Sequence, residues 1–486
     1  MAETASRAHK PSTRLIATLG PASWTPPAIR ELVLAGADAF RLNFSHGDHD
    51  VLRGVVACVR EIARDLKQPV AILGDLCGPK LRVGIVEKGD SISLEDGAEV
   101  LLDPACPGVS LARIGVSHAA LVEDVPAGSA ILLDDGNLEL LALERSGGCL
   151  RARVIHGGEL KSRKGVNVPG VMLTIPAITE KDAEDLAFGM EMDLDYFAMS
   201  FVRTARDVTD LKRRIALHGQ HIPVISKIEM PIAVENLDSI LDVSDGIMVA
   251  RGDLGVEIGP ERLPVVQKEI IRAARRRGKL VITATQMLDS MTHHPRPTRA
   301  EATDVANALF DGTDAVMLSQ ETAVGSYPVA TVRTMREIAW HAEESALFAA
   351  QARQFQRPVD HGIAHAAIKA ACVAAEEVEA KALVVFSTTG WTAFGAAAWR
   401  PPCPIFACTD DERTFNRFAL CRGSRAWFIP TASDIESLYS SGLAAPLAEG
   451  LLAKDDVVVL LSGARTSGSG ANSIRIHKVG AGGLRS

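Results

Sequence analysis

Short apolar segments alternate with longer amphipathic ones along most of the chain, and this alternation constrains the fold more than any other feature. Amphipathic segments such as 260–277 and 298–309 separate apolar segments that have the length of buried strands. Strand candidates of this kind span residues 14–20, 40–45, 70–75, 196–202, 224–229, 247–252, 280–286 and 315–319. Strands that alternate with helices run parallel. Eight of them predict a closed (β/α)8 TIM barrel, with an open doubly wound sheet as the alternative.

Nearly every strand candidate begins apolar and ends polar, and this favours the barrel. In (β/α)8 enzymes the active site is built at the carboxyl ends of the strands, so polar residues at many strand ends meet at one mouth. The polar residues at or just beyond these ends are Arg41, Asn43, Ser45, Asp75, Arg203, Lys227, Glu229, Arg251, Asp253, Thr285, Gln286, Ser319 and Glu321.

The alternation is interrupted twice, and each interruption indicates another domain. Residues 78–177 show short β-like runs between Gly, Pro and Asp turns, which predicts a small β-barrel lid domain inserted after the third strand. From residue 345 a new α/β pattern begins, with strands expected near 382–387, 404–409 and 457–462. We therefore expect a flexible tail at 1–13, a catalytic barrel at 14–77 and 178–344, the lid at 78–177, and a regulatory α/β domain at 345–486.

Lys227, Glu229 and Asp253 form the chemically most informative group. Residues i and i+2 of a strand project to the same face, so Lys227 and Glu229 point the same way. A cation beside two carboxylates suits a divalent metal that holds an anionic substrate next to a fixed positive charge. A buried structural salt bridge would explain one such pair, but with Arg41 there are four charges at neighbouring strand ends. The group indicates phosphoryl transfer.

Composition excludes several other classes of function. The formal net charge of −8 and an aromatic content of 5% argue against a nucleic-acid binder. The eight cysteines form no Cys-x-x-Cys pair and no metal-binding spacing, and His46, His49, His293 and His294 lack a zinc frame. Without an apolar run that could span a bilayer, we expect no membrane partner and a cytoplasmic location.

Six segments taken in order resemble the motifs of the pyruvate kinase family, and the resemblance covers nearly the whole chain from residue 14. The segments are Arg41-Leu-Asn-Phe-Ser-His46, Asp75-Leu-Cys-Gly-Pro-Lys80, Ser226-Lys-Ile-Glu229, Met248-Val-Ala-Arg-Gly-Asp-Leu-Gly255, Thr283-Ala-Thr-Gln-Met-Leu288 and Pro295-Arg-Pro-Thr-Arg-Ala-Glu301. One such motif alone would be a weak signal, but several in order are specific.

The resemblance implies the reaction and a role for each matching residue. Pyruvate kinases transfer the phosphoryl group of phosphoenolpyruvate to ADP and then protonate the enolpyruvate. Glu229 and Asp253 match the ligands of Mg²⁺ (or Mn²⁺), and Lys227 and Arg41 match the cations on the phosphoryl group. Gly252 and Asp253 would offer backbone N–H groups to the substrate carboxylate. Thr285 matches the proton-delivery side, where a water relay is expected. Asn43, His46, Arg82 and Lys164 match nucleotide-side positions.

The chain departs from many family members beside the substrate. Those enzymes have Thr and Glu where this chain has Leu76 and Lys80, and they bind K⁺ through positions that match Asn43, Ser45 and Asp75. By themselves these three residues could be turn or cap residues. The ammonium of Lys80 has the charge of the ion, so the sequence predicts activity without K⁺. A solvated surface lysine is the alternative. The family Gly at position 320 is Gln here, which nothing in the sequence explains.

The C-terminal region contains a Ser/Thr/Gly loop that matches the effector loop of the family, at Ser387, Thr388, Thr389, Gly390 and Thr392. Because Thr388 stands where bisphosphate-activated enzymes usually have Lys, we expect a sugar monophosphate or AMP, with Arg465 assisting; an ordinary turn is the alternative. The family implies a homotetramer. A non-catalytic phosphoenolpyruvate sensor and another barrel enzyme acting on phosphoenolpyruvate or pyruvate are the alternative functions.

Overall fold

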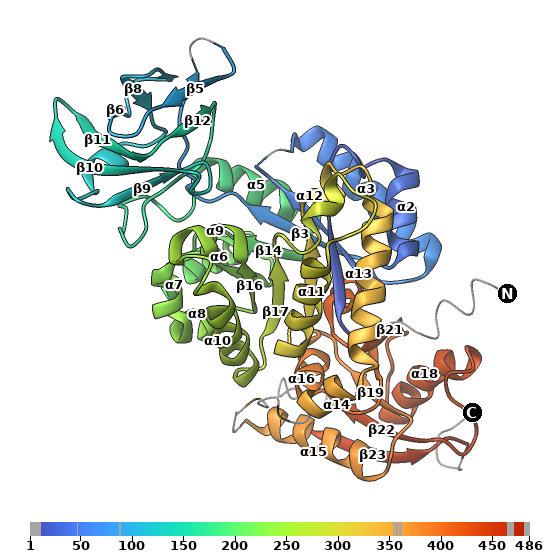
Figure 1. Cartoon of the computed structure of the whole chain (residues 1–486). Helices are drawn as coiled ribbons and strands as arrows, with labels where there is room; N and C mark the ends of the chain where they lie inside the picture. The colour runs from blue at the N-terminus through green and yellow to red at the C-terminus, as the bar shows by residue number, and fades with distance from the viewer. Residues whose placement is uncertain are drawn as a thin grey trace.

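The centre of the molecule is a closed barrel of parallel strands, in the spatial order β1-β18-β17-β16-β15-β14-β3-β2 (Figure 1). The computed structural model describes residues 11–45, 47–86, 89–352, 354, 358, 362–463 and 471–480. The barrel strands are β1 (Arg14–Leu19), β2 (Ala39–Asn43), β3 (Ala71–Leu76), β14 (Tyr196–Met199), β15 (Val224–Ile228), β16 (Gly246–Ala250), β17 (Leu280–Ala284) and β18 (Ala315–Leu318). All the expected strands form, and the closed barrel is confirmed over the open sheet.

Helices cover the outside of the barrel and bury their apolar faces against the strands. In α3, for example, Leu52, Val55, Val56 and Val59 recur at helical spacing and are all buried. The segments around the barrel are α2 (Pro26–Ala35), α3 (His49–Leu66), α5 (Glu180–Glu191), α6 (Ala205–Leu217), α7 (Pro231–Glu235), α8 (Leu237–Val243), α9 (Arg251–Ile258), α10 (Leu263–Arg276), η1 (Asp289–Thr292), α11 (Arg299–Asp311), α12 (Gln320–Ala323) and α13 (Pro328–Glu343).

A separate β domain is inserted between β3 and α5 and stands away from the barrel in Figure 1. One sheet has the order β13-β9-β10-β11-β6-β8-β7-β4, and β12 pairs with β5 beside it. The elements are β4 (Ile85–Val86), β5 (Ser91–Leu94), β6 (Glu99–Asp103), β7 (Gly108–Val109), β8 (Arg113–Gly115), α4 (Ala120–Glu123), β9 (Ala130–Leu133), β10 (Leu138–Ser146), β11 (Cys149–His156), β12 (Gly158–Lys161) and β13 (Val166–Asn167). The domain has its own core, and it leaves the barrel at the carboxyl end of β3.

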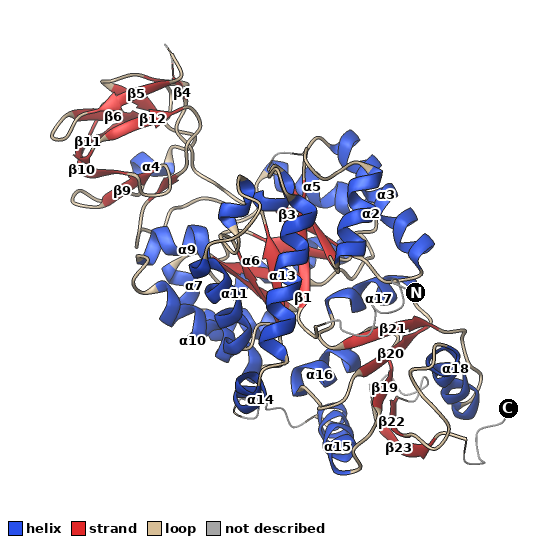
Figure 2. Ribbon diagram, turned by 45° about the vertical axis from the view of Figure 1, so that its right-hand side comes forward, coloured by secondary structure: helices blue, strands red, loops and turns tan. Residues whose placement is uncertain are grey.

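The C-terminal domain is a sheet of order β21-β20-β19-β22-β23 between helices (Figure 2). Alternate residues of its central strand face opposite layers, since Leu383 and Val385 pack with α15 and α16, while Val384 packs with α18. The elements are α14 (Ala346–Ala352), α15 (Ile363–Glu377), β19 (Ala382–Phe386), α16 (Trp391–Trp399), β20 (Ile405–Thr409), α17 (Glu412–Arg417), η2 (Phe418–Leu420), β21 (Ser424–Phe428), α18 (Ile435–Ala448), β22 (Val457–Ser462) and β23 (Ser473–Lys478).

The C-terminal domain closes the amino-terminal end of the barrel. Leu420 of η2 is fully buried and packs with Ile16, Met248 and Ile282, which fill the barrel interior. The hydroxyl of Tyr196, at the start of β14, donates to the carbonyl of Arg417 at 3.0 Å. The carboxyl ends of the strands therefore open on the other side, toward the inserted β domain. The domain boundaries given above stay a prediction.

Among the described residues, no helix is both long and apolar enough to cross a membrane.

Candidate active site at the carboxyl ends of the barrel strands

Lys227 is a buried ammonium between two buried carboxylates. Its Nζ lies 2.9 Å from Oε1 of Glu229 and 3.3 Å from Oδ1 of Asp75, and it donates to the hydroxyl of Ser200 at 2.6 Å. The residues come from the ends of β15, β3 and β14, which are neighbours in the barrel. Burial alone would lower the pKa of Lys227, but the two carboxylates outweigh it and raise that pKa. Lys227 is thus a permanent cation at neutral pH.

Arg41 adds a second cation at the end of β2. Its Nε donates to Oδ2 of Asp75 at 2.6 Å, and its Nη1 donates to the hydroxyl of Thr18 at 3.3 Å. Burial would raise the pKa of Asp75, yet Lys227 and Arg41 together hold it below its ordinary value. Asp75 is therefore an ionised anchor that orients both cations toward the mouth of the barrel.

Glu229 and Asp253 form the acidic side of the site. Burial raises the pKa of Glu229, and the neighbouring charge of Asp253 raises it further, although Lys227 opposes both effects. Oε2 of Glu229 accepts the backbone N–H of Phe201 at 2.6 Å, and Oδ1 of Asp253 lies 3.1 Å from Nζ of Lys80. Two carboxylates that disfavour each other's charge suit a divalent cation, and their all-oxygen donor set fits Mg²⁺.

Thr285 lies directly after β17 in a strained backbone conformation. Its φ is +67° and that of Gln286 is +52°, in a region that β-branched residues rarely occupy. The hydroxyl of Thr285 accepts the N–H of Gly252 at 2.8 Å and donates to the carbonyl of Ala284 at 2.6 Å. This hydroxyl therefore lies at the first turn of α9, where backbone N–H groups favour anions.

The predicted nucleotide-side residues lie in two places. Asn43 is at the end of β2, opposite Asp75 in the strand register. In the inserted domain, Nζ of Lys164 lies 2.7 Å from Oδ1 of Asp134, and Arg82 donates to the carbonyl of Arg163 at 3.0 Å. Lys164 and Arg82 thus have partners within the inserted domain, whereas Asn43 lies on the barrel. His46 lies outside the described residues.

The positions that match the monovalent-cation site already have partners within the protein. Oδ1 of Asn43 accepts the N–H of Ser45 at 3.2 Å, and the hydroxyl of Ser45 donates to Sγ of Cys77 at 3.0 Å. Both oxygens of Asp75 face cations, as described above. Lys80 is one-third exposed and is held by Asp253 rather than fully solvated. The structure therefore places its charge at the edge of the acidic side.

The predicted effector loop follows β19 and leads into α16. Gly390 caps that helix with a φ of +84°, the left-handed region that glycine favours. The carbonyl of Thr388 accepts the hydroxyl of Thr414 at 2.7 Å, and the side chain of Thr392 is buried. Ser387 donates its N–H to the carbonyl of Cys408. Arg465 lies outside the described residues.

Sequence reasoning missed two residues that shape the site. Ser200 accepts from Lys227, and Phe201, with a φ of +52°, turns its N–H to Glu229. The available signal was weak, since Ser200 is a lone hydroxyl at the end of an otherwise apolar strand.

Comparison with known proteins identifies the family. Residues 10–332 match the model of the pyruvate kinase barrel domain, and residues 365–477 match that of the pyruvate kinase alpha/beta domain. The chain belongs to the pyruvate kinase family. It is 41% identical to pyruvate kinase 2 of Synechocystis sp. over 465 residues, which is 95% of this chain and 78% of that protein. It is also 41% identical to pyruvate kinase of Geobacillus stearothermophilus over 478 residues, which is 97% of this chain and 81% of that protein.

The two domain matches include both the residues at the barrel mouth and the loop after β19. The first domain match contains Lys227, Arg41 and Glu229, and the second contains the loop after β19. The chain is therefore an enzyme of this family, and the resemblance inferred from the sequence motifs is confirmed.

Proposed function

We propose that the chain transfers the phosphoryl group of phosphoenolpyruvate to ADP in a Mg²⁺-dependent reaction that gives pyruvate and ATP. The observation that carries this proposal is the buried group at the barrel mouth, in which Lys227 and Arg41 are fixed by Asp75 beside the carboxylate of Glu229. Phosphoryl transfer is catalysed chiefly by positioning and charge stabilisation, and this group supplies both.

Each residue of the group has a defined task in the proposed reaction. Lys227 and Arg41 neutralise the oxygens of the phosphoryl group as its bond to the enol oxygen breaks and a bond to an ADP oxygen forms. Glu229 and Asp253 would hold Mg²⁺, which supplies positive charge to substrate oxygens when bound. The first turn of α9, at Gly252 and Asp253, binds the substrate carboxylate. Asn43, His46, Arg82 and Lys164 serve the nucleotide.

The enolpyruvate that remains takes up a proton to become pyruvate. The hydroxyl of Thr285 is fixed between Gly252 and Ala284, which supports a role in orienting a water relay. A hydroxyl with an ordinary pKa is too weak an acid to act alone. The proton therefore comes from solvent by way of this hydroxyl.

We further propose that the enzyme needs no K⁺. Lys80 carries a fixed positive charge 3.1 Å from Asp253, next to the carboxylates of the site. Asp75 already receives two protein cations, so an added ion has little charge left to neutralise. The predicted homotetramer, the cytoplasmic location and the sugar-monophosphate or AMP effector at residues 387–392 belong to the same proposal.

A coupled assay of ADP-dependent pyruvate formation tests the function. We expect turnover with phosphoenolpyruvate, ADP and Mg²⁺ in tetramethylammonium buffer, with little change when K⁺ is added. Absence of pyruvate with saturating substrates would favour a non-catalytic sensor, and pyruvate formed without ADP would favour another barrel enzyme. A rate that depends strongly on K⁺ would overturn the role of Lys80 alone.

A further inference from the structure

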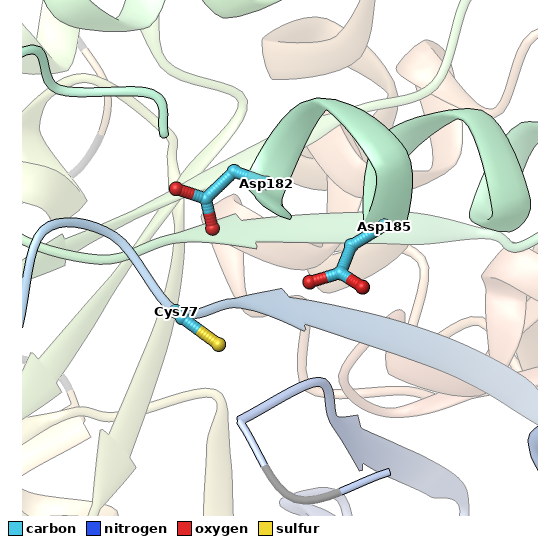
Figure 3. Close-up of side chains that lie close together, drawn as sticks. All are labelled: Cys77, Asp182 and Asp185. Carbon is cyan, nitrogen blue, oxygen red and sulfur yellow. The ribbon is translucent and has the colours of Figure 1, made fainter. Parts of the chain in front are cut away.

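Cys77, Asp182 and Asp185 meet where the inserted domain is attached to the barrel (Figure 3). Cys77 directly follows β3, and the two aspartates lie three residues apart on one face of α5. Their ligand atoms, a sulfur and two carboxylate oxygens, all lie within 4.8 Å of one another. Asp182 and Asp185 are almost completely buried. The cluster is separate from Glu229 and Asp253, which lie at the ends of other strands.

His49 of α3 contacts the cluster through Asp185 and holds that carboxylate in place. Its Nε2 lies 2.8 Å from Oδ1 of Asp185, and its ring stacks on Phe188 with the ring centroids 4.3 Å apart. The end of β3 and the helix α5 thus combine one sulfur and two carboxylate donors. Such a mixed set is typical of Zn²⁺ and related transition metals, whereas Mg²⁺ prefers oxygen alone.

The present partners of the cluster are compatible with an added cation. Asp185 accepts from Nζ of Lys181 at 2.9 and 2.7 Å, so a positive charge already lies against this carboxylate. Nζ of Lys181 also donates to the carbonyl of Phe44 at 2.8 Å, and the Lys181 side chain is 50% exposed, so solvent can replace both partners when a metal binds Asp185. Asp182 accepts the N–H of Gly78 at 3.0 Å through one oxygen and the hydroxyl of Thr179 at 2.7 Å through the other. Carboxylate oxygens have further lone pairs for a metal.

We propose that Cys77, Asp182 and Asp185 bind a thiophilic divalent cation of the Zn²⁺ type, with water in the remaining position. Tetrahedral Zn²⁺ has bonds of about 2.0 to 2.3 Å, so the donors move together by roughly 1 Å as it binds. The S–H bond of Cys77 breaks, its proton passes to solvent, and the electron pair stays on sulfur to form the bond to the metal. No oxidant or reductant is involved.

The site would join the two connections of the inserted domain. Cys77 and Gly78 are where the chain leaves the barrel, and Thr179 and Asp182 cap the helix on which it returns. A metal bound to Cys77 and to α5 therefore fixes the exit and the return of the domain relative to each other. This inference rests on the donor geometry and is independent of the proposed catalytic function.

Cobalt provides the sharpest test, because a thiolate–Co²⁺ bond produces a charge-transfer band in the near ultraviolet and an all-oxygen site does not. Chelator-treated full-length protein is titrated with Co²⁺ while excess Mg²⁺ occupies oxygen sites. We expect one equivalent of Co²⁺ to produce the band and Zn²⁺ to remove it. Cys77→Ser should abolish the band, and Cys58→Ser, at a partly buried thiol of α3, should leave it unchanged. Asp185→Asn should weaken Co²⁺ binding by more than about tenfold.

A second measurement uses the unsubstituted chain and avoids any effect of a variant on folding. Maleimide labelling of Cys77, followed by peptide mass spectrometry, should slow by about tenfold or more when Zn²⁺ is present in excess of its binding constant, since a metal-bound thiolate is withheld from the reagent. Absence of the cobalt band in the wild-type protein, its persistence in Cys77→Ser, or equal labelling of Cys77 with and without Zn²⁺ would each overturn the proposal.

Discussion

At the scale of single residues, the candidate active site consists of charges that hold one another in place. Asp75 contacts Arg41 and Lys227, and Lys227 also contacts Glu229. Asp75, Lys227 and Glu229 are buried and Arg41 is partly buried, so removing one of them leaves a buried neighbour without compensation. We therefore expect substitutions in this network to change stability and activity together.

Lys227→Met should abolish most of the activity. The variant loses the cation next to the transferring phosphoryl group, and loss of a single preorganised contact of this kind costs roughly 10²- to 10³-fold in kcat. It should also be less stable by about 3 kcal/mol, since Glu229 and Asp75 lose a buried partner. Steady-state kinetics and denaturant unfolding measure the two effects. Lys212→Met removes a lysine paired with Asp245 on the barrel exterior and should keep kcat near the wild-type value. Wild-type kcat in Lys227→Met would contradict the assignment.

Lys80→Glu should make the enzyme dependent on K⁺. The substitution places a second negative charge beside Asp253, where the structure now has a positive one. In tetramethylammonium buffer we expect the rate to fall by at least about tenfold, which corresponds to ~1.4 kcal/mol in the barrier, and K⁺ should restore most of it. Lys80→Met serves as the control, because it removes the ammonium without adding charge. Equal rates of Lys80→Glu with and without K⁺ would count against the proposal.

The sequence predicted which side chains lie at the mouth of the barrel, but not how they pair. Lys227 and Glu229 follow from the two-residue period of a strand. The contacts of Asp75 with Arg41 and of Lys227 with Ser200 depend on the neighbouring strands β2 and β14, and strand order is a tertiary property. The pairing of Lys80 with Asp253 joins segments 173 residues apart and left no local signal.

At the scale of elements, the expected strands and the observed ones differ most where the backbone has positive φ values beside the candidate site. The pattern predicted strands at 196–202 and 280–286, whereas β14 ends at Met199 and β17 at Ala284. Phe201, Thr285 and Gln286 then adopt positive φ values, which turn backbone and hydroxyl groups toward the site. Apolar periodicity contains no information about such turns, so the prediction failed at positions where local preference is overridden.

Thr298→Ala should lower the free energy of unfolding by about 1 kcal/mol, the usual cost of losing an N-cap. Thr298 caps α11, and Glu301 returns a bond to its N–H while also accepting from Ser290 of η1. Urea unfolding followed by circular dichroism measures the change. Thr303→Ala, on the same helix, removes a hydroxyl that donates to the carbonyl of Arg299 within the helix and should change stability little. Equal losses in both variants would argue against the cap.

At the scale of the whole molecule, the barrel and the C-terminal domain are joined by buried polar contacts. Glu343, at the end of α13, accepts the N–H groups of Ser12 and Thr13 and pairs with Arg422 at 2.8 Å. Arg14 donates to the carbonyl of Cys421 at 2.8 Å. Apolar patterning does not reveal such contacts, because both partners look like ordinary surface residues in the sequence. The separate C-terminal α/β domain was predicted from the sequence, but the surface that joins it to the barrel was not.

Glu343→Gln should weaken this junction and alter its response to acid. Burial would raise the pKa of Glu343, but Arg422 and the hydrogen bonds from Thr13 and Ser12 outweigh it and hold the pKa below the ordinary value. The ionised Glu343 therefore contributes its full stabilisation of the folded state above about pH 4.3, which is the pKa of Glu in an unfolded chain. This contribution is lost as the pH falls through the lower pKa that Glu343 has in the folded protein. The variant should lose about 3 kcal/mol at neutral pH and show a smaller further loss in acid.

Thermal unfolding between neutral pH and about pH 3 measures this response, since the range spans the ordinary pKa of Glu. Glu376→Gln, at an exposed position of α15, is the matched control and should follow the wild-type protein at every pH. A Glu343→Gln curve that parallels the wild-type curve in acid would contradict the role of this carboxylate.

Strand β14 contacts the C-terminal domain at its first residue and leads to the candidate site at its carboxyl end. Tyr196, its first residue, is hydrogen-bonded to the C-terminal domain, and Ser200, just beyond its last residue, touches the ammonium of Lys227. Four residues of extended chain, about 13 Å, separate these two contacts. Strand β14 therefore connects the C-terminal domain directly to the candidate site. We expect a displacement of the C-terminal domain that moves Tyr196 to shift Ser200 and its contact with Lys227.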